Sequence, residues 1–276
     1  MNERFGWRST LWFLVFSGAL QFLLLLFFLP ETMRPPRKIL KREPSNGAVR
    51  ELTNWEIFKT YAFEPIKLLR LLRYPPVILS IAYASVAFGA LYCMNISVTY
   101  TFSIAPYNFT STIVGLLYLG NSLGYLVGSL LGGRWSDYVF VRSAAKHGGE
   151  LEAEGRFGIN TWVGAVMYPL GLLMYGWTIE KGLFVVIPEI GTFFMGFGMM
   201  IVFATVTTYL IDAVPGRSSS AVAMNNLLRN TLACIGTIIG KPLIEALGNG
   251  VLFSIICGIA LASSAFIWAI TKVYIS

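Results

Sequence analysis

Long stretches without charge, separated by short charged segments, are the feature that most limits how this sequence can fold. Apolar residues make up 55% of the 276 residues and charged residues only 13%, about half the charged share of soluble domains. A helix of about 20 apolar residues crosses the hydrocarbon core of a bilayer. The sequence holds seven such stretches, namely 9–29, 76–98, 112–131, 159–179, 183–211, 219–246 and 251–273. We therefore predict an all-α, polytopic membrane protein with seven transmembrane helices.

Lysine and arginine alternate between the connections and so indicate the orientation. Ten of them lie in 30–75 and four in 132–158, whereas 99–111 and 247–250 hold none. Basic residues concentrate in cytoplasmic loops, which places 30–75, the loop after the third span and the C-terminus in the cytoplasm. The net charge of +7 is then a topology signal, and we predict no nucleic-acid partner.

The connection 30–75 separates the first span from the rest and suggests three segments, 1–29, 30–75 and 76–276. It is proline-rich at first, and from Asn54 apolar residues recur at helical spacing among charges. That pattern predicts an amphipathic helix on the inner leaflet. On the predicted outer side, Asn108-Phe-Thr is a candidate glycosylation sequon.

A ladder of glycines runs down the third span. Spacing of four keeps them on one helix face, and a face without side chains lets a neighbouring helix approach closely. Its members are Gly120, Gly124, Gly128 and Gly132. A charged turn with Arg134 and Asp137 is expected directly after it. Two interpretations stay open: a packing seam with a polar helix end, or a packed helix of a membrane protein that moves.

Polar residues inside spans are costly and tend to mark function. The sixth span is the richest, with Asn225, Asn226, Arg229 and Asn230. We interpret them either as the lining of a cavity that binds a solute or as an interhelical hydrogen-bond cluster. Glu189 in the fifth span is interpreted either as a protonatable site or as an interfacial carboxylate.

No pattern in the sequence indicates catalysis or a bound cofactor. There is no Ser/His/Asp set, no metal-ligand cluster and no phosphate-binding glycine loop followed by lysine. The three cysteines, Cys93, Cys234 and Cys257, lie in apolar stretches, and an odd count argues against a disulfide framework. We predict that the protein is not an enzyme and needs no metal or cofactor.

Three motifs, in the right order, resemble the major facilitator superfamily. Residues 132–138 with Arg142 are similar to the C-terminal copy of its signature loop. Residues 5–34 resemble the sixth helix of the fungal drug:proton antiporters, and 211–225 resemble the junction of their tenth and eleventh helices. The resemblance covers essentially the whole chain and is specific for the family, although not for a substrate.

The resemblance implies a fold and residue roles. The family has twelve helices in two halves with the solute site between them. Segment 1–29 then corresponds to the last helix of the N-terminal half, 30–75 to the central cytoplasmic loop and 76–276 to the C-terminal six-helix bundle. Helices one to five, and with them most of the N-terminal half, are missing, so we expect an N-terminally truncated form. The conformational latch implied by the family comprises Gly132, Gly133, Arg134, Asp137 and Arg142, and the implied cavity residues are Asn225, Asn226, Arg229 and Asn230.

The implied activity is secondary-active export of small organic molecules or cations in exchange for protons, in a full-length form. The plasma membrane is the expected location and the vacuolar membrane the second. Two alternatives stay open: a non-transporting remnant or partner of a full-length transporter, and a seven-helix receptor. The long first inner loop and the glycine ladder speak against the receptor. The sequence does not set the substrate, the direction, the coupling ion or the organelle.

Overall fold

The computed structural model describes residues 6–28, 40–42, 49–51, 74–146, 153–214 and 218–274. The chain divides into two compact units, Met1–Pro65 and Ile66–Ser276. Each unit is described by itself.

The first unit contains one helix and a short hairpin. Helix α2 spans Trp7–Phe28, and its 22 residues extend about 33 Å, enough to cross a bilayer. Strands β1 (Leu40–Arg42) and β2 (Val49–Glu51) pair antiparallel, with Leu40 opposite Glu51. The amphipathic helix predicted from Asn54 lies outside the described residues.

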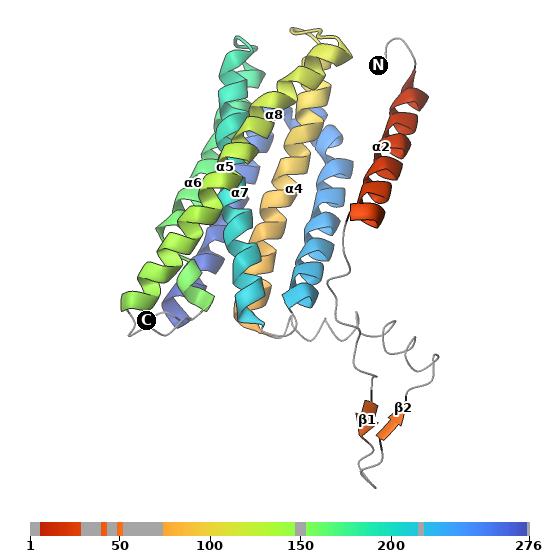
Figure 1. Cartoon of the computed structure of the whole chain (residues 1–276). Coiled ribbons are helices and arrows are strands. Elements are labelled where there is room, and N and C mark those ends of the chain that lie inside the picture. Colours follow the sequence, from red (N-terminus) through yellow and green to blue (C-terminus); the bar gives the residue numbers. More distant parts are fainter. Residues whose placement is uncertain are drawn as a thin grey trace. The chain divides into compact units, whose positions relative to one another are not determined.

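The second unit is a bundle of long helices (Figure 1). Its elements are α4 (Pro75–Ser103), α5 (Ser111–Lys146), the 3₁₀ turn η2 (Ala153–Arg156), α6 (Ile159–Glu180), α7 (Val186–Ala213) and α8 (Ser218–Tyr274). Helix α8 is two helices, 218–247 and 249–274, because Gly248 between them has φ 77° and ψ 166°. Across the described ranges six helices are long and apolar enough to span a membrane. With α8 divided, they match the seven predicted spans, and the prediction of an all-α polytopic membrane protein is confirmed.

Local sequence sets where several helices begin and end. Prolines at the start of α4, where no N–H is needed, and in the first turn of α7 suit helix N-termini. Gly248 reaches a left-handed φ that other residues adopt with strain. The carboxylate of Glu180 then accepts the backbone N–H of Asn249 at 2.6 Å and of Gly250 at 3.3 Å. A carboxylate from α6 therefore caps the helix 249–274.

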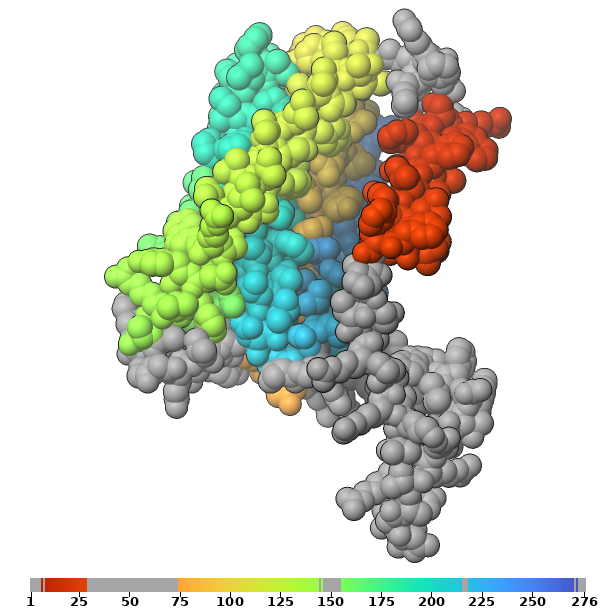
Figure 2. Space-filling model, in the orientation of Figure 1, coloured from red at the N-terminus to blue at the C-terminus, as the bar shows by residue number. Residues whose placement is uncertain are grey.

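The bundle is held by three helix pairings and one shared core. Helix α4 packs along α8, while α5 and α6 both pack against α7. In Figure 2, α5 (yellow to green) runs across the visible face of this unit with α7 (cyan) beside it. Large side chains fill the interior, including Tyr83, Tyr168, Tyr175, Tyr209 and Phe253, each at most 1% exposed.

The third span is longer than predicted. We expected it to end at Leu131 and to be followed by a charged turn, but α5 continues as a helix to Lys146. The turn predicted over 132–138 is therefore wrong. A helix satisfies its own backbone hydrogen bonds, so it can continue beyond the apolar layer, and each internal glycine costs it only about 1 kcal/mol.

Candidate functional site

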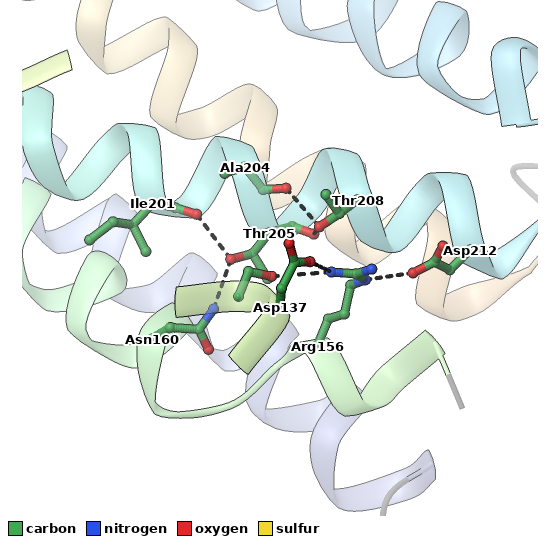
Figure 3. A network of polar contacts seen from close by, with 9 residues as sticks. Asp137, Arg156, Asn160, Ile201, Ala204, Thr205, Thr208 and Asp212 are labelled. Carbon is green, nitrogen blue, oxygen red and sulfur yellow. Dashed lines mark hydrogen bonds and ion pairs between the residues drawn. The ribbon is translucent and has the colours of Figure 1, made fainter. Parts of the chain in front are cut away.

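Arg156 is the centre of a charge cluster at the end of the bundle that the charge pattern assigns to the cytoplasm (Figure 3). It is the last residue of η2, and its side chain is 10% exposed. Its Nη1 donates to Oδ1 of Asp137 on α5 at 3.1 Å, and its Nε donates to Oδ2 of Asp212 on α7 at 2.5 Å. One arginine thus joins two helices and the segment between α5 and α6.

The two carboxylates meet different surroundings. The side chain of Asp137 is 69% exposed, whereas that of Asp212 is 33% exposed. Arg156 also lies over the ring of Phe140 at 4.3 Å, and its Nη1 reaches Oγ of the buried Ser136 at 3.5 Å. Because a guanidinium offers five N–H groups in a rigid fork, it can satisfy both acids while stacking on a ring.

A second polar contact lies beside this cluster and joins α6 to α7. The buried Asn160 donates from Nδ2 to Oγ1 of Thr205 at 3.2 Å, and Thr205 donates to the Ile201 carbonyl at 3.0 Å (Figure 3). Thr208 likewise donates to the Ala204 carbonyl at 2.8 Å. Of these hydrogen bonds, the one between Asn160 and Thr205 joins α6 to α7 next to Arg156, and the other two lie within α7.

The glycine ladder of α5 faces α7 along its length. A Cβ at each of the first three positions would overlap the neighbouring helix, and one at the fourth would be tightly packed. The pairs are Gly120 with Glu189, Gly124 with Phe193, Gly128 with Phe197, and Gly132 with Ile201. Both series advance by four residues, so the two helices run parallel with their backbones close together. This glycine seam leads from Glu189 towards the Arg156 cluster.

The predicted latch residues do not all meet. Asp137 lies in the cluster and Gly132 in the seam, but a Cβ on Gly133 would meet open space. Arg134 is exposed and, within the described ranges, forms no ion pair. Arg142 donates from Nη1 to the hydroxyl of Tyr138 at 3.3 Å. The partner of Asp137 is instead Arg156.

The predicted cavity residues of the sixth span lie in the first part of α8. Asn225 is fully buried, and neither its Oδ1 nor its Nδ2 has a hydrogen-bond partner among the described residues. Arg229 is half-buried, and its guanidinium stacks on Phe88 of α4 at 3.9 Å and on Phe203 of α7 at 4.6 Å. Asn226 is half-buried and Asn230 exposed. Asn225 and Arg229 thus lie one helical turn apart, buried and half-buried, while Asn230 is exposed.

Comparison with known proteins decides the family. The family model described as Major Facilitator Superfamily matches residues 1–237. The chain belongs to the major facilitator superfamily. It is a transporter-family protein rather than an enzyme, as predicted from its motifs, and the match favours a transporter over a seven-helix receptor.

Three relatives of this superfamily member come from fungi. MFS transporter OpS2 of Beauveria bassiana is 39% identical over 292 residues, covering 99% of this chain and 83% of the relative. MFS antiporter QDR3 of Candida albicans is 43% identical, covering 79% of this chain and 32% of the relative. Quinidine resistance protein 3 of Saccharomyces cerevisiae is 36% identical, covering 82% and 32%. The chain thus spans most of the first relative but about a third of the other two. No solved structure matches it.

Two residues of the cluster were not predicted in this role. Arg156 was counted only among the basic loop residues, and Asp212 was noted only within the 211–225 motif. The sequence did contain a sign that Asp212 is functional, because it is an acid at the predicted cytoplasmic end of a mostly apolar span. Its partner comes from a loop 56 residues earlier in the chain, and sequence spacing does not predict that pairing.

Two further predicted positions are placed by the structure. Glu189 is half-buried; its Oε2 accepts from Thr192 at 3.3 Å, and its buried Oε1 has no partner among the described residues. Asn108 is exposed in the turn between α4 and α5, with φ 47°, and its glycosylation stays a prediction.

Within the described ranges no group of three His, Cys, Asp or Glu residues is placed to hold a metal ion.

Proposed function

We infer that this chain takes part in secondary-active export of small organic molecules by alternating access, and that the Asp137–Arg156–Asp212 cluster is a contact that opens and closes during transport. The observation that carries this proposal is the uneven pair of contacts around Arg156. The side chain of Asp137 is 69% exposed, about twice the 33% exposed fraction of Asp212. This arrangement suits a contact in which Arg156 stays bound to Asp212 while its bond to Asp137 breaks and re-forms.

The energies of the two contacts support different roles. Ion pairs exposed to water contribute about 0–1 kcal/mol, so thermal motion breaks them readily. Pairs away from water cost about 3–5 kcal/mol when one partner is removed. The pair of Arg156 and Asp212 lies between these two cases, because Arg156 is 10% exposed and Asp212 is 33% exposed. We therefore assign Asp212 the anchoring role and Asp137 the releasable one.

The solute site of the proposed transporter lies around Asn225, Asn226, Arg229 and Asn230. A partly exposed polar helix face inside a membrane needs a polar or wet neighbour. In this family the solute site lies between two helical halves. We infer that a second bundle, corresponding to the N-terminal half, covers this face.

We assign coupling to protons to Glu189. Its carboxylate is half-buried at the end of α7 that the charge pattern places outside, with one oxygen unpartnered. The names of two relatives, an antiporter and a quinidine resistance protein, support antiport of drug-like molecules. The plasma membrane is the proposed location and the vacuolar membrane the second.

Dye export from yeast cells tests this proposal. The chain is expressed in a strain lacking its own dye exporters, beside the Asp137→Asn and Lys181→Gln variants. We expect faster dye loss than with empty vector, and about fivefold slower export with Asp137→Asn, since one coupling contact is worth about 1 kcal/mol. Lys181→Gln, which removes an exposed charge outside the predicted sites, is the control and should export normally. Dye loss equal to that of the empty vector would instead favour a non-transporting protein.

A further inference from the structure

The guanidinium of Arg229 is held in place but its hydrogen bonds are not satisfied. Phe88 and Phe203 lie 3.9 and 4.6 Å from it, which fixes its plane and stabilises its charge. Aromatic faces do not accept the N–H groups at the edge of that plane. Its Nε and Nη1 are buried and have no hydrogen-bond partner among the described residues.

A second polar group beside it is also unsatisfied. Asn225 lies four residues before Arg229, one turn away on the same helix face. Its side chain is fully buried, and neither amide atom has a partner within the described ranges. The amide of Asn225 and two N–H groups of Arg229 therefore lie about one helical turn apart, and none of these polar atoms has a hydrogen-bond partner within the described ranges.

The charged groups of α7 do not supply that acceptor. Glu189 lies fourteen residues before Phe203, about 21 Å along the helix. Asp212 lies nine residues after Phe203, about 13 Å along the helix, and is bonded to Arg156. Within the described ranges no carboxylate forms an ion pair with Arg229.

We propose that Arg229 and Asn225 form the binding site for the negatively charged group of an aromatic organic anion, such as a carboxylate. A guanidinium edge matches the two oxygens of a carboxylate. Phe88, Phe203 and the partly exposed Tyr92 on α4 offer apolar surface for the body of the molecule. This inference rests on the proposed function and narrows it: the preferred solute is an organic anion, whereas the family resemblance implied small organic molecules or cations.

Binding of two related dyes tests the inference without requiring transport. Fluorescein and rhodamine 123 share a xanthene scaffold, and at neutral pH the first is an anion and the second a cation. Fluorescence polarisation is measured with the purified chain in nanodiscs of phosphatidylcholine. We expect tighter binding of fluorescein, and roughly tenfold or greater loss of its affinity with Arg229→Gln, because charge-assisted hydrogen bonds are removed.

Two variants keep this result interpretable. Arg229→Lys preserves the charge but not the fork, so it should retain part of the affinity. Lys241→Gln removes a cation of α8 that pairs with Glu245, and it should bind like the unchanged chain. Melting curves of all variants check that each is folded.

The outcomes separate this inference from the proposed function. Tighter binding of rhodamine 123, or unchanged fluorescein binding with Arg229→Gln, would overturn the anion site. Repeating the assay with phosphatidylglycerol in the nanodiscs tests a lipid source of the anion: complete loss of fluorescein binding there would assign the site to lipid headgroups and overturn the solute site. Arg229-dependent binding without any dye export would leave the anion site intact and contradict only the proposed export.

Discussion

Among single residues, Arg156 stands out because its guanidinium contacts two carboxylates from two different helices. Its side chain is largely enclosed, and it reaches Asp137 on α5 and Asp212 on α7 through different nitrogens. An arginine can do so because its fork is planar and always charged, whereas a lysine offers one compact ammonium. The identity of this residue therefore matters beyond its charge.

Replacing Arg156 should destabilise the bundle. We expect Arg156→Gln to lower the free energy of unfolding by about 2 kcal/mol, less than for a fully buried pair, because Asp212 keeps some contact with water. Arg156→Lys should fall between that variant and the unchanged chain. The measurement is the melting temperature in detergent micelles.

Arg142→Gln is the matched control for that experiment. Arg142 lies near the C-terminal end of α5, as Asp137 does, but among the contacts described it reaches only the hydroxyl of Tyr138. Its removal should leave the melting temperature nearly unchanged. Equal melting temperatures for Arg156→Gln and Arg142→Gln would contradict the anchoring role of Arg156.

At the scale of elements, the glycine seam sets how close α5 and α7 can lie. A Cβ on Gly124 would overlap the carbonyl of Phe193, which belongs to the backbone and cannot rotate away. Close approach of this kind is what small residues permit in membrane helices, where van der Waals contact rather than hydrophobic burial holds helices together.

Adding one methyl group should therefore separate the two helices. We expect Gly124→Ala to lower the melting temperature, although alanine favours an isolated helix by about 1 kcal/mol. Gly115→Ala on the same helix is the matched control, because its Cβ would meet open space, and it should be neutral or stabilising. A melting temperature of Gly124→Ala equal to that of Gly115→Ala would count against a tight seam.

The cap on the last helix offers a second prediction at this scale. Glu180→Ala removes the acceptor of the Asn249 and Gly250 N–H groups, which should cost about 1–2 kcal/mol. Glu245→Ala removes an exposed carboxylate that pairs with Lys241 and accepts from the hydroxyl of Tyr100, and it should cost less, about 0.5 kcal/mol, because both contacts are open to water. Thermal unfolding of both variants checks the difference, and an equal loss would contradict the capping role.

For the whole molecule, the positions of the membrane spans could be predicted from the sequence because a bilayer restricts their length and composition. Every span must be apolar and about 20 residues long, and the predicted second span, 76–98, lies within α4, Pro75–Ser103. The charged segment after the glycine ladder was harder to predict, because outside the apolar layer charges do not by themselves end a helix. The pairing of Arg156 with Asp212 depends on how a loop folds back on the bundle, and residue spacing does not contain that information.

The Asp137–Arg156–Asp212 cluster is proposed to open during transport. Ser136 is fully buried beneath Arg156, so a cysteine there should react only when the cluster is open. The measurement is the rate at which a membrane-impermeant maleimide, added from the cytoplasmic side, labels Ser136→Cys in a chain whose Cys93, Cys234 and Cys257 are replaced by alanine. Val141→Cys, at a position 65% exposed on the same helix, controls for access of the reagent.

We expect slow labelling of Ser136→Cys at rest, faster labelling during dye export, and fast labelling without export when Asp137→Asn is added. Val141→Cys should react rapidly in every condition. A labelling rate for Ser136→Cys that is the same at rest, during export and with Asp137→Asn would contradict a cluster that opens and closes.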